Sequence, residues 1–440
     1  MQRGEAAILL GTRSAVFTPA QDLGLIILDE EHDSSFKQQE GFRFSARDVA
    51  VMRANIHNVP VVMGSATPSL ESLYNVSQGR YRLLELPFRA GGAAKPRFQI
   101  LDIRAQSLNE GISSQLAGLM NETLARGEQT LLFVNRRGFA PVLMCHDCGW
   151  LAKCRYCDAN MVLHAADKQL RCHHCGHEQA LPSICPDCRQ ARLHPLGLGT
   201  ERVEAALTEM LPKARIVRID RDSTRRKGSL QRALDDAQNG HADILVGTQM
   251  LAKGHHFPDV TLVGILDVDA GLYSTDFRAE ERTAQLITQV AGRAGRETKP
   301  GTVILQTRHP QHPLLDVLVR QGYPAFAHAC LKEREEADLP PCSHQALWRA
   351  ESSNAQYAQD FLHAIARLAQ NCQDESILTL GPAPAPLVRR NNRYRWQLLM
   401  QSGSRKRLHT ALDHLMNQAH SLDGKRKVRW SVDVDPVDLY

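Results

Sequence analysis

Four Cys-x-x-Cys pairs lie in one short internal stretch of the chain and constrain its folding more than any other feature. They contain eight of the eleven cysteines, and each pair places two thiols about one tetrahedral edge apart. This spacing suits Zn²⁺ at a Zn–S distance of ~2.3 Å. A disulfide framework is the alternative, but the absence of a secretory signal and the long cysteine-free flanks favour a reducing compartment. We therefore expect two closed structural zinc sites with the ligands Cys145, Cys148, Cys154, Cys157, Cys172, Cys175, Cys185 and Cys188.

The spacing between the pairs favours a nested arrangement of the two sites. Five residues separate Cys148 from Cys154, which is tight for two knuckles on one ion, whereas fourteen separate Cys157 from Cys172. The longer spacing is close to the ~15–20 residues of zinc ribbons. The inner ion is then expected on Cys154, Cys157, Cys172 and Cys175, and the outer ion on Cys145, Cys148, Cys185 and Cys188. Four histidines are interpreted as surface residues or outer donors rather than ligands, namely His146, His173, His174 and His177.

Length, composition and charge set broad limits. At ~100–200 residues per domain, 440 residues predict two to four domains. An apolar share of 43% supports real cores and argues against wholesale disorder. The formal net charge of +5 permits nucleic-acid binding without demonstrating it. We expect a soluble cytoplasmic protein, because no stretch approaches the ~20 apolar residues of a membrane helix and the N-terminus lacks a signal-peptide pattern.

Apolar runs alternate with helix-like segments, which is typical of an α/β protein with a parallel sheet covered on both faces. The expected strands are 23–28, 59–63, 131–134, 215–219, 244–246, 262–266 and 303–305. The expected helices are 201–210, 229–238 and 280–291. After about residue 340 the pattern changes, and a long helix at 355–370 with a terminal strand at 427–434 indicates a separate α+β domain.

An acidic cluster, Asp29-Glu30-Glu31-His32, follows the first apolar strand. Carboxylates at the C-terminal end of a parallel strand project from the sheet edge where ligands bind in doubly wound folds. One carboxylate can hold Mg²⁺ through water while its neighbour orients or deprotonates an attacking water. Helix capping or simple solvent exposure is the alternative, and the motif alone does not decide between them.

A second motif, residues 289–296, combines small residues with Arg293 and Arg296. If the segment is helical, the two arginines lie three residues apart on one side. Guanidinium groups placed in this way can clamp charge that develops on a transferring γ-phosphoryl group. A basic helix end favoured by the helix dipole is the alternative.

Several segments resemble the motifs of superfamily 2 helicases, in the right order. Residues 11–14 look like motif Ib, 29–32 like a DExH motif II, 64–68 like motif III, 133–138 like motif IV, 247–254 like motif V and 289–296 like motif VI. The resemblance implies ATP and Mg²⁺ as cofactors. It assigns nucleotide, Mg²⁺ or water-activating roles to Asp29, Glu30, His32, Gly254, Gln289, Arg293 and Arg296. Val290 departs from the pattern, because many relatives carry arginine there.

A cysteine-rich insertion directly after motif IV narrows the resemblance to the primosomal protein N′ family of bacterial replication-restart helicases. Residues 135–150, 251–260 and the closing Asp433-Val434-Asp435-Pro436 are similar to that family, and the similarity spans essentially the whole chain. It implies an ATP-dependent 3′→5′ DNA helicase that recognises stalled or branched forks. It also implies primosome assembly that reloads the replicative helicase.

The resemblance also implies DNA contacts. An aromatic-rich loop between motifs II and III offers rings for base stacking, worth ~1–3 kcal/mol per base, and cations for phosphates. A hydrophobic staple of a surface loop is the alternative. A second basic cluster, at 389–396, is either a solvated basic face or a contact for branched DNA and the acidic tail of single-stranded DNA-binding protein. The expected DNA contacts are Arg13, Phe36, Lys37, Phe42, Arg43, Phe44, Arg393 and Arg395.

The predicted fold class is α/β, with tandem RecA-like helicase lobes, an incomplete first lobe, a two-zinc all-cysteine insertion and a C-terminal α+β domain. The expected divisions are 1–90 for the C-terminal part of lobe 1, 91–144 for a linker and the start of lobe 2, 145–190 for the zinc insertion, 191–338 for lobe 2 and 339–440 for a DNA- and partner-binding domain. No Gly-x-x-x-x-Gly-Lys-Ser/Thr occurs, so we expect a fragment that hydrolyses ATP poorly or depends on a partner.

Two other classes of protein remain open from the residues alone. A zinc-ribbon nucleic-acid-binding module without motor activity explains the cysteines but leaves the 289–296 motif without a purpose. A nuclease could use Asp29, Glu30 and Glu31 with two metal ions.

Overall fold

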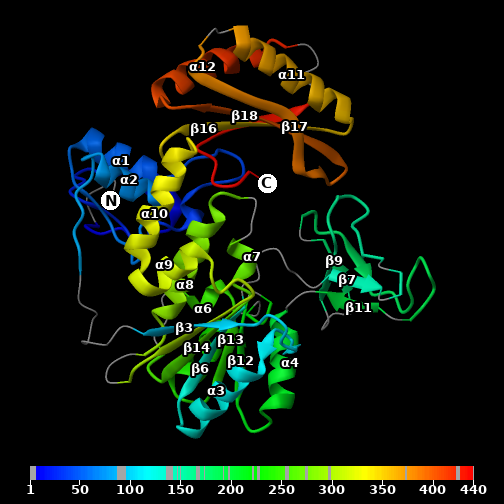
Figure 1. Ribbon diagram of the computed structural model, residues 1–440. Coiled ribbons are helices and arrows are strands. Elements are labelled where there is room, and N and C mark those ends of the chain that lie inside the picture. The colour runs from blue at the N-terminus through cyan, green and yellow to red at the C-terminus, as the bar shows by residue number, and fades with distance from the viewer. Residues whose placement is uncertain are drawn as a thin grey trace. The chain divides into compact units, whose positions relative to one another are not determined.

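The computed structural model describes residues 6–86, 96–134, 142–145, 147–148, 150–164, 169–172, 174–191, 193–196, 199–220, 222–224, 228–252, 257–272, 276–295, 299–371, 374–422 and 427–439. The chain divides into two compact units, and Figure 1 shows their elements. Unit 1 comprises Met1–Leu83, Cys330–Val388 and Arg393–Tyr440. Unit 2 comprises Leu84–Ala329 and Arg389–Asn392.

A parallel sheet forms the centre of unit 2, with the strand order β12-β13-β6-β14-β15-β3 among the described residues. Every residue of β6 and β14 is buried, as expected for the central strands of a sheet with helices on both faces. The strands are β3 (Arg97–Asp102), β6 (Gln129–Val134), β12 (Ile216–Ile219), β13 (Ile244–Gly247), β14 (Val260–Leu266) and β15 (Thr302–Thr307).

Helices cover this sheet on both sides, with α3 and α4 on one face and α6 and α8 on the other (Figure 1). Leu116 and Met120 of α3 are fully buried against Leu132 of β6, and Val203 and Leu207 of α4 join the same core. The helices are α3 (Ser114–Ala125), α4 (Thr200–Met210), α5 (Ser229–Gln238), α6 (Gln249–Ala252), α7 (Asp269–Leu272), α8 (Ala279–Ala291) and α9 (Pro313–Gln321). A short hairpin, β4 (Leu108–Asn109) and β5 (Ile112–Ser113), precedes α3.

The cysteine-rich module is a small antiparallel sheet in unit 2 with the order β10-β9-β8-β7-β11. Its strands are β7 (Val142–Cys145), β8 (Val162–His164), β9 (Gln169–Arg171), β10 (Glu178–Ala180) and β11 (Leu193–Leu196). Their apolar core is small and includes Leu143, Met161 and Leu170 together with cysteines. A core of this size is marginal without cross-links.

The first part of unit 1 contains the parallel pair β1 (Ile26–Leu28) and β2 (Val61–Met63). Helices α1 (Ala46–His57) and α2 (Leu70–Ser77) and the 3₁₀ turns η1 (Arg13–Phe17) and η2 (Ser34–Phe36) accompany it. Ser45 caps α1 and Ser69 caps α2, each by accepting a backbone N–H three residues on.

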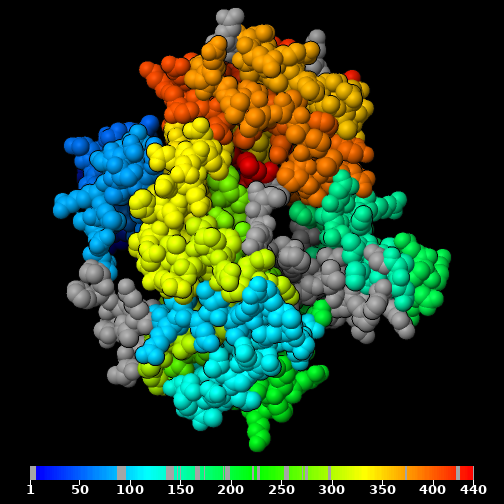
Figure 2. Space-filling view, in the orientation of Figure 1, coloured from blue at the N-terminus to red at the C-terminus, as the bar shows by residue number. Residues whose placement is uncertain are grey.

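The second part of unit 1 is an α+β domain with the sheet order β17-β18-β16-β19. Helices α11 and α12 cover one face (Figure 1). Trp348, Leu362 and Leu415 are fully buried in the core of this domain. The space-filling view shows this part, coloured orange to red, as a closely packed body (Figure 2). Its elements are β16 (His344–Ser352), α11 (Ala355–Asn371), β17 (Ile377–Arg390), β18 (Arg393–Ser402), α12 (Arg405–Ala419) and β19 (Arg429–Val434), and α10 (Tyr323–Glu336) leads into it from unit 2.

The strands expected in unit 2 coincide with β6 and β12–β15 to within two residues at either end. Strand β3 and helices α1, α2 and α3 were not predicted, because short or Ala-rich segments give weak periodicity. In the described part of the chain, no helix is both long enough and apolar enough to cross a membrane.

Candidate functional site: a tetracysteine module, an acidic strand end and an aromatic loop

The eight cysteines lie in two separate groups. One contains Cys154, Cys157, Cys172 and Cys175, and the other contains Cys145, Cys148, Cys185 and Cys188. Within each group the ligand sulfurs all lie within 4.8 Å of one another. The structure therefore has the nested arrangement that the spacing favoured.

The sulfur positions fit tetrahedral zinc. The separation of Sγ atoms is 3.5 Å for Cys145 and Cys188, and 3.7 Å for Cys154 and Cys175. Four sulfurs at ~2.3 Å from one ion would lie ~3.8 Å apart, which is close to these values. Four thiolates leave no open coordination position, so zinc held here supplies a structural cross-link rather than a catalytic water.

All four Cys-x-x-Cys pairs fold into the same turn. In each pair the backbone N–H of the first cysteine donates to the carbonyl five residues later, at 2.8 Å: Cys145 to Trp150, Cys154 to Ala159, Cys172 to His177 and Cys185 to Gln190. The repeated turn aims both sulfurs of a pair to one side, which explains how two separated pairs can share an ion.

Residues Arg389–Asn392, which are the end of β17 and the two-residue turn before β18, belong to unit 2 and lie against the inner cysteine group. Asn391 and Asn392 have the positive φ angles of 50° and 59° that a tight hairpin turn requires. The Asn391 N–H donates to Cys157 Sγ at 3.2 Å, and Arg389 pairs with Asp158 at 3.4 Å. Burial is the largest cause that raises the pKa of the Cys157 thiol, to about 12, while the Asn391 N–H opposes that rise. Thiolate formation at Cys157 therefore needs the compensation that a bound cation supplies.

The acidic cluster follows β1 in unit 1, at the C-terminal end of the strand as expected. Glu30 has a left-handed backbone, with φ at 49°, and its N–H donates to Asp29 Oδ1 at 2.9 Å. Glu30 Oε2 is buried and has no hydrogen-bond partner among the described residues, although His32 Nδ1 lies 3.6 Å away. An unsatisfied buried carboxylate oxygen is an available acceptor for a water or a hydrated cation.

Glu31 points away from this edge and is buried. Its carboxylate accepts the Ser69 N–H at 2.7 Å, the Ser69 and Ser72 hydroxyls at 3.0 Å each, and Arg47 Nη1 at 3.2 Å. Burial lowers the pKa of Arg47, but the carboxylates around it, including Glu71 and Glu31, outweigh that effect and raise it. Because Glu31 is committed to this network, the nuclease hypothesis loses one of its three carboxylate ligands.

The network around Glu31 joins the acidic cluster to the segment 64–72. His32 Nδ1 lies 2.7 Å from Ser65 Oγ, and the Glu31 N–H donates to the Gly64 carbonyl at 3.1 Å. Arg47 and Ser72 were not identified from the sequence as parts of this site. A serine at the N-cap of α2, Ser69, is the sequence signal that could have indicated a polar network at this position.

The 289–296 motif is only partly helical. Helix α8 ends at Ala291 with Gly292 as its C-cap, and Arg293 lies in the turn that follows. Gly295 has φ at 64°, and a Cβ atom there would lie 2.3 Å from the Gly301 backbone nitrogen, so only glycine fits. Arg293 is therefore not part of the helix, contrary to the expectation of a helical segment, and Arg296 lies outside the described residues.

Other predicted nucleotide contacts are distributed over the chain. Gln289 lies near the end of α8 in unit 2, whereas Asp29 and Glu30 belong to unit 1. Their convergence on one nucleotide therefore stays a prediction. Gly254, Arg296, and residues 135–138 of motif IV lie outside the described residues.

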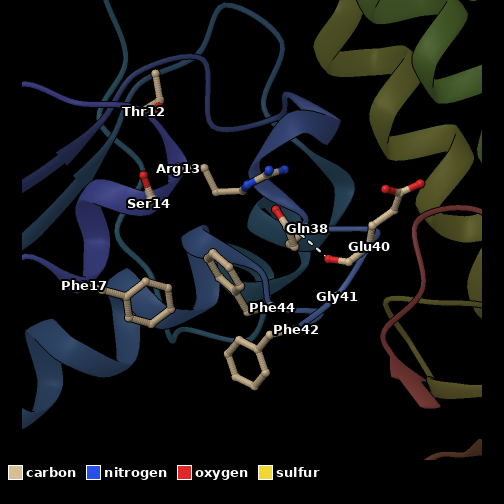
Figure 3. A pocket seen from close by; sticks show the side chains of 9 residues that line it. All are labelled: Thr12, Arg13, Ser14, Phe17, Gln38, Glu40, Gly41, Phe42 and Phe44. Carbon is tan, nitrogen blue, oxygen red and sulfur yellow. Dashed lines mark hydrogen bonds between the residues drawn. The ribbon is translucent and has the colours of Figure 1, made fainter. Parts of the chain in front are cut away.

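Phenylalanines form a small aromatic cluster beside η1 in unit 1. Phe17 and Phe44 meet edge to face with ring centroids 4.7 Å apart, and Phe42 stacks on Phe44 at 5.8 Å. They line one side of a pocket of about 330 Å³ with Arg13 and Gln38 on other sides (Figure 3). Phe42 is 77% exposed, so its ring face is accessible to a planar ligand such as a base.

Two predicted phosphate contacts of this region are engaged inside the protein. Arg13 Nη1 donates to the carbonyls of Ser35 at 2.9 Å and Lys37 at 3.2 Å. The Lys37 ammonium is buried, 2.9 Å from Asp433 Oδ1 and 2.6 Å from the Val434 carbonyl. Phosphate contact by Lys37 requires these interactions to open, whereas the two bonds of Arg13 involve only Nη1 of its guanidinium.

The remaining predicted DNA contacts outside the aromatic cluster are half-buried or exposed. Phe36 is half-buried in η2, and Arg43 is half-buried near Asp433. Burial and the neighbouring Arg349 lower the pKa of Arg43 from its usual value. Arg393 is exposed at the start of β18, and Arg395 Nη1 lies 3.4 Å from the Leu387 carbonyl.

Comparison with known families places these features in context. Residues 335–437 match the family described as Primosomal protein N C-terminal domain, and 154–179 match the PriA DNA helicase Cys-rich region domain. Residues 198–298 match the Helicase conserved C-terminal domain.

Curated relatives match nearly the whole chain. Replication restart protein PriA of Haemophilus influenzae is 50% identical over 436 residues, which are 99% of this chain and 60% of the relative. The protein of the same name from Bacillus subtilis is 40% identical over 440 residues, 99% of this chain and 54% of the relative. The chain thus spans between about half and three fifths of their length.

Solved structures show only a weak likeness. RecG bound to a three-way DNA junction has a TM-score of 0.35 at 13% identity, covering 72% of this chain and 30% of RecG. Dbp5 of S. cerevisiae bound to RNA and ADP BeF3 has a TM-score of 0.36 at 12% identity, covering 70% of this chain and 58% of Dbp5. Values this low support no conclusion about function.

The parallel lobe, the family match over 198–298 and the two tetracysteine groups define a protein with a helicase C-terminal domain and an insertion suited to structural zinc. This confirms the predicted fold class. The chain belongs to the PriA family of replication restart proteins, which confirms the resemblance inferred from the motifs.

Proposed function

We propose that this chain is the motor-lobe and DNA-engaging portion of an ATP-driven 3′→5′ DNA helicase. It acts at stalled or branched forks and starts primosome assembly to reload the replicative helicase. Membership of the PriA family is the observation that carries this proposal. A zinc-ribbon module without motor activity is less well supported, because residues 198–298 match a helicase domain.

In this proposal Asp29 and Glu30 hold the Mg²⁺ of bound ATP and orient the attacking water. Glu30 Oε2 supports this role, because it is an acceptor that receives no hydrogen bond from the described residues. When bound, Mg²⁺ neutralises phosphate charge. The hydrogen bond between His32 and Ser65 connects the acidic cluster to the 64–72 segment. Gln289, Arg293, Arg296 and Gly254 are further proposed nucleotide contacts.

Single-stranded or forked DNA is the proposed substrate of the aromatic cluster. Stacking on Phe42 and Phe44 tolerates any base, because every base has a π-face. Sequence-independent binding suits an enzyme that acts wherever a fork stalls. Single-stranded DNA-binding protein, other primosome proteins and the helicase loader are the proposed protein partners, and the fork is the proposed cellular location.

DNA binding by the aromatic cluster can be measured on the 440-residue chain. Forked DNA labelled at the junction is titrated with wild type and with Phe42→Ala/Phe44→Ala, and binding is followed by anisotropy. Loss of two stacking faces, at ~1–3 kcal/mol each, predicts roughly 30-fold or greater weakening.

Tyr357→Ala is the matched control, since Tyr357 is also a partly exposed aromatic residue of unit 1 but lies on α11. It should bind like wild type. Equal affinity of the Phe42→Ala/Phe44→Ala variant and wild type would remove the aromatic cluster from the proposed interface.

A further inference from the structure

A buried ion pair ties the aromatic region of unit 1 to the last strand of the chain. Lys37 and Asp433 are 396 positions apart in the numbering, yet their side chains are only 6% and 4% exposed and their charged atoms lie 2.9 Å apart. The Val434 carbonyl accepts a second contact from Lys37 at 2.6 Å. Removing one member of such a pair leaves a buried charge without compensation, which is costly.

Lys37 lies at one end of a short loop whose two ends pair with each other. It pairs with Ser45 as an isolated antiparallel bridge, and the Gln38 N–H donates to the Phe44 carbonyl at 2.8 Å. Residues 37–45, here called the aromatic loop, therefore close at a neck formed by their two ends. Ser45 is fixed as the N-cap of α1, so the other end of the neck depends on what holds Lys37.

More cations than carboxylates converge on this neck. Asp433 also accepts a hydrogen bond from Arg349 Nη1 at 3.0 Å. Arg43 lies close enough to interact electrostatically with both Asp433 and Arg349. Arg349 has a second acceptor, the Asp438 carbonyl at 2.7 Å. Among the described contacts of Lys37, Asp433 supplies the negative charge. A DNA phosphate is an anion that could take the place of Asp433.

We propose that Asp433 is a positioning residue for the aromatic loop. It sequesters the Lys37 ammonium, fixes the neck of the loop, and thereby holds Phe42 and Phe44 in their stacked arrangement. Its effect on DNA rests on the proposed function of the aromatic cluster. Its effect on the loop does not.

Hydrogen exchange of the full chain without DNA tests the positioning role. In Asp433→Asn and in Lys37→Met, amides of residues 38–44 should exchange at least about tenfold faster than in wild type. The double variant should exchange no faster than either single one, because both remove the same interaction. Lys37→Arg, which keeps the charge, should restore most of the protection.

Asp435→Asn is the matched control, because it removes the pair of Asp435 with Arg405, two residues along the chain, without touching Lys37. Its loop should exchange like wild type. Unchanged exchange in Asp433→Asn and Lys37→Met, or effects that simply add in the double variant, would overturn the proposal.

Salt dependence of duplex DNA binding tests the sequestration of Lys37. Freeing one cation should steepen the slope of log K against log salt by about 0.9 in Asp433→Asn, but not in the double variant. An unchanged slope in Asp433→Asn would overturn sequestration. If wild type binds no DNA, the proposed function fails while the exchange rates still decide the positioning role.

Discussion

Glu30 and Glu31, at the end of β1, have different surroundings. The left-handed backbone at Glu30 turns the chain so that Glu30 keeps a carboxylate oxygen without a hydrogen-bond partner among the described residues, while Glu31 enters the interior. The sequence shows three consecutive carboxylates without distinguishing them. The distinction arises because Arg47, Ser69 and Ser72 come from two later helices or their caps, and a one-dimensional motif does not contain that information.

Glu31→Gln should loosen α2. The amide keeps the size of the side chain but removes the charge that pairs with Arg47 and one acceptor position of a buried carboxylate. We expect a loss of about 2 kcal/mol in local stability, which corresponds to roughly 30-fold faster hydrogen exchange of the α2 amides.

Glu71→Gln is the control for this change, because Glu71 is partly exposed and its carboxylate lies 4.0 Å from Arg47. It should shift exchange only slightly. If both variants behave alike, the charge of Glu31 does not organise the connection between the acidic cluster and α2.

At the scale of elements, predictability follows burial and spacing. The strands of unit 2 could be predicted because fully buried parallel strands are continuous apolar runs. The nested cysteine groups follow from loop length. The end of α8 at Ala291 was predicted, but the turn at Gly295 could not be, because it depends on the close approach of Gly301, six residues further along the chain.

Zinc binding at the outer tetracysteine site should depend on the inner site more than the inner site depends on the outer one. The inner cysteines lie within a segment of 22 residues that also contributes most of the module's buried core. The outer group closes a longer loop. The entropy cost of binding zinc there is smaller when the inner loop is already ordered. Cys148→Ser should therefore retain close to one zinc per chain, whereas Cys157→Ser should retain clearly less than one.

Zinc per chain is measured after gel filtration, with wild type expected to hold two. Cys342→Ser, outside both groups, is the control and should also hold two. A Cys157→Ser variant that keeps one tightly bound zinc while Cys148→Ser loses both would reverse the proposed order of assembly.

At the scale of the whole molecule, the features that escaped prediction are contacts between distant parts of the sequence. Lys37, a predicted DNA contact, pairs with Asp433, and Asn391 lies against Cys157. Local periodicity carries no information about such pairs. The net charge of +5 is small for a chain of this length. DNA binding should therefore depend on which cations stay accessible rather than on their number.

Charge reversal at Arg393 and Arg395 tests that view. Arg393 is exposed on β18 next to the half-buried Arg395, and both are predicted DNA contacts. Arg393→Glu/Arg395→Glu should weaken fork DNA binding at least tenfold at low salt and flatten the slope of log K against log salt by about 1–2, since up to two phosphate contacts are lost. Arg320→Glu/Lys332→Glu makes the same change in net charge at two highly exposed helical positions. If this control weakens binding equally, total charge rather than a local contact governs affinity. If only the Arg393→Glu/Arg395→Glu variant loses affinity and slope, β18 is part of the DNA-binding surface.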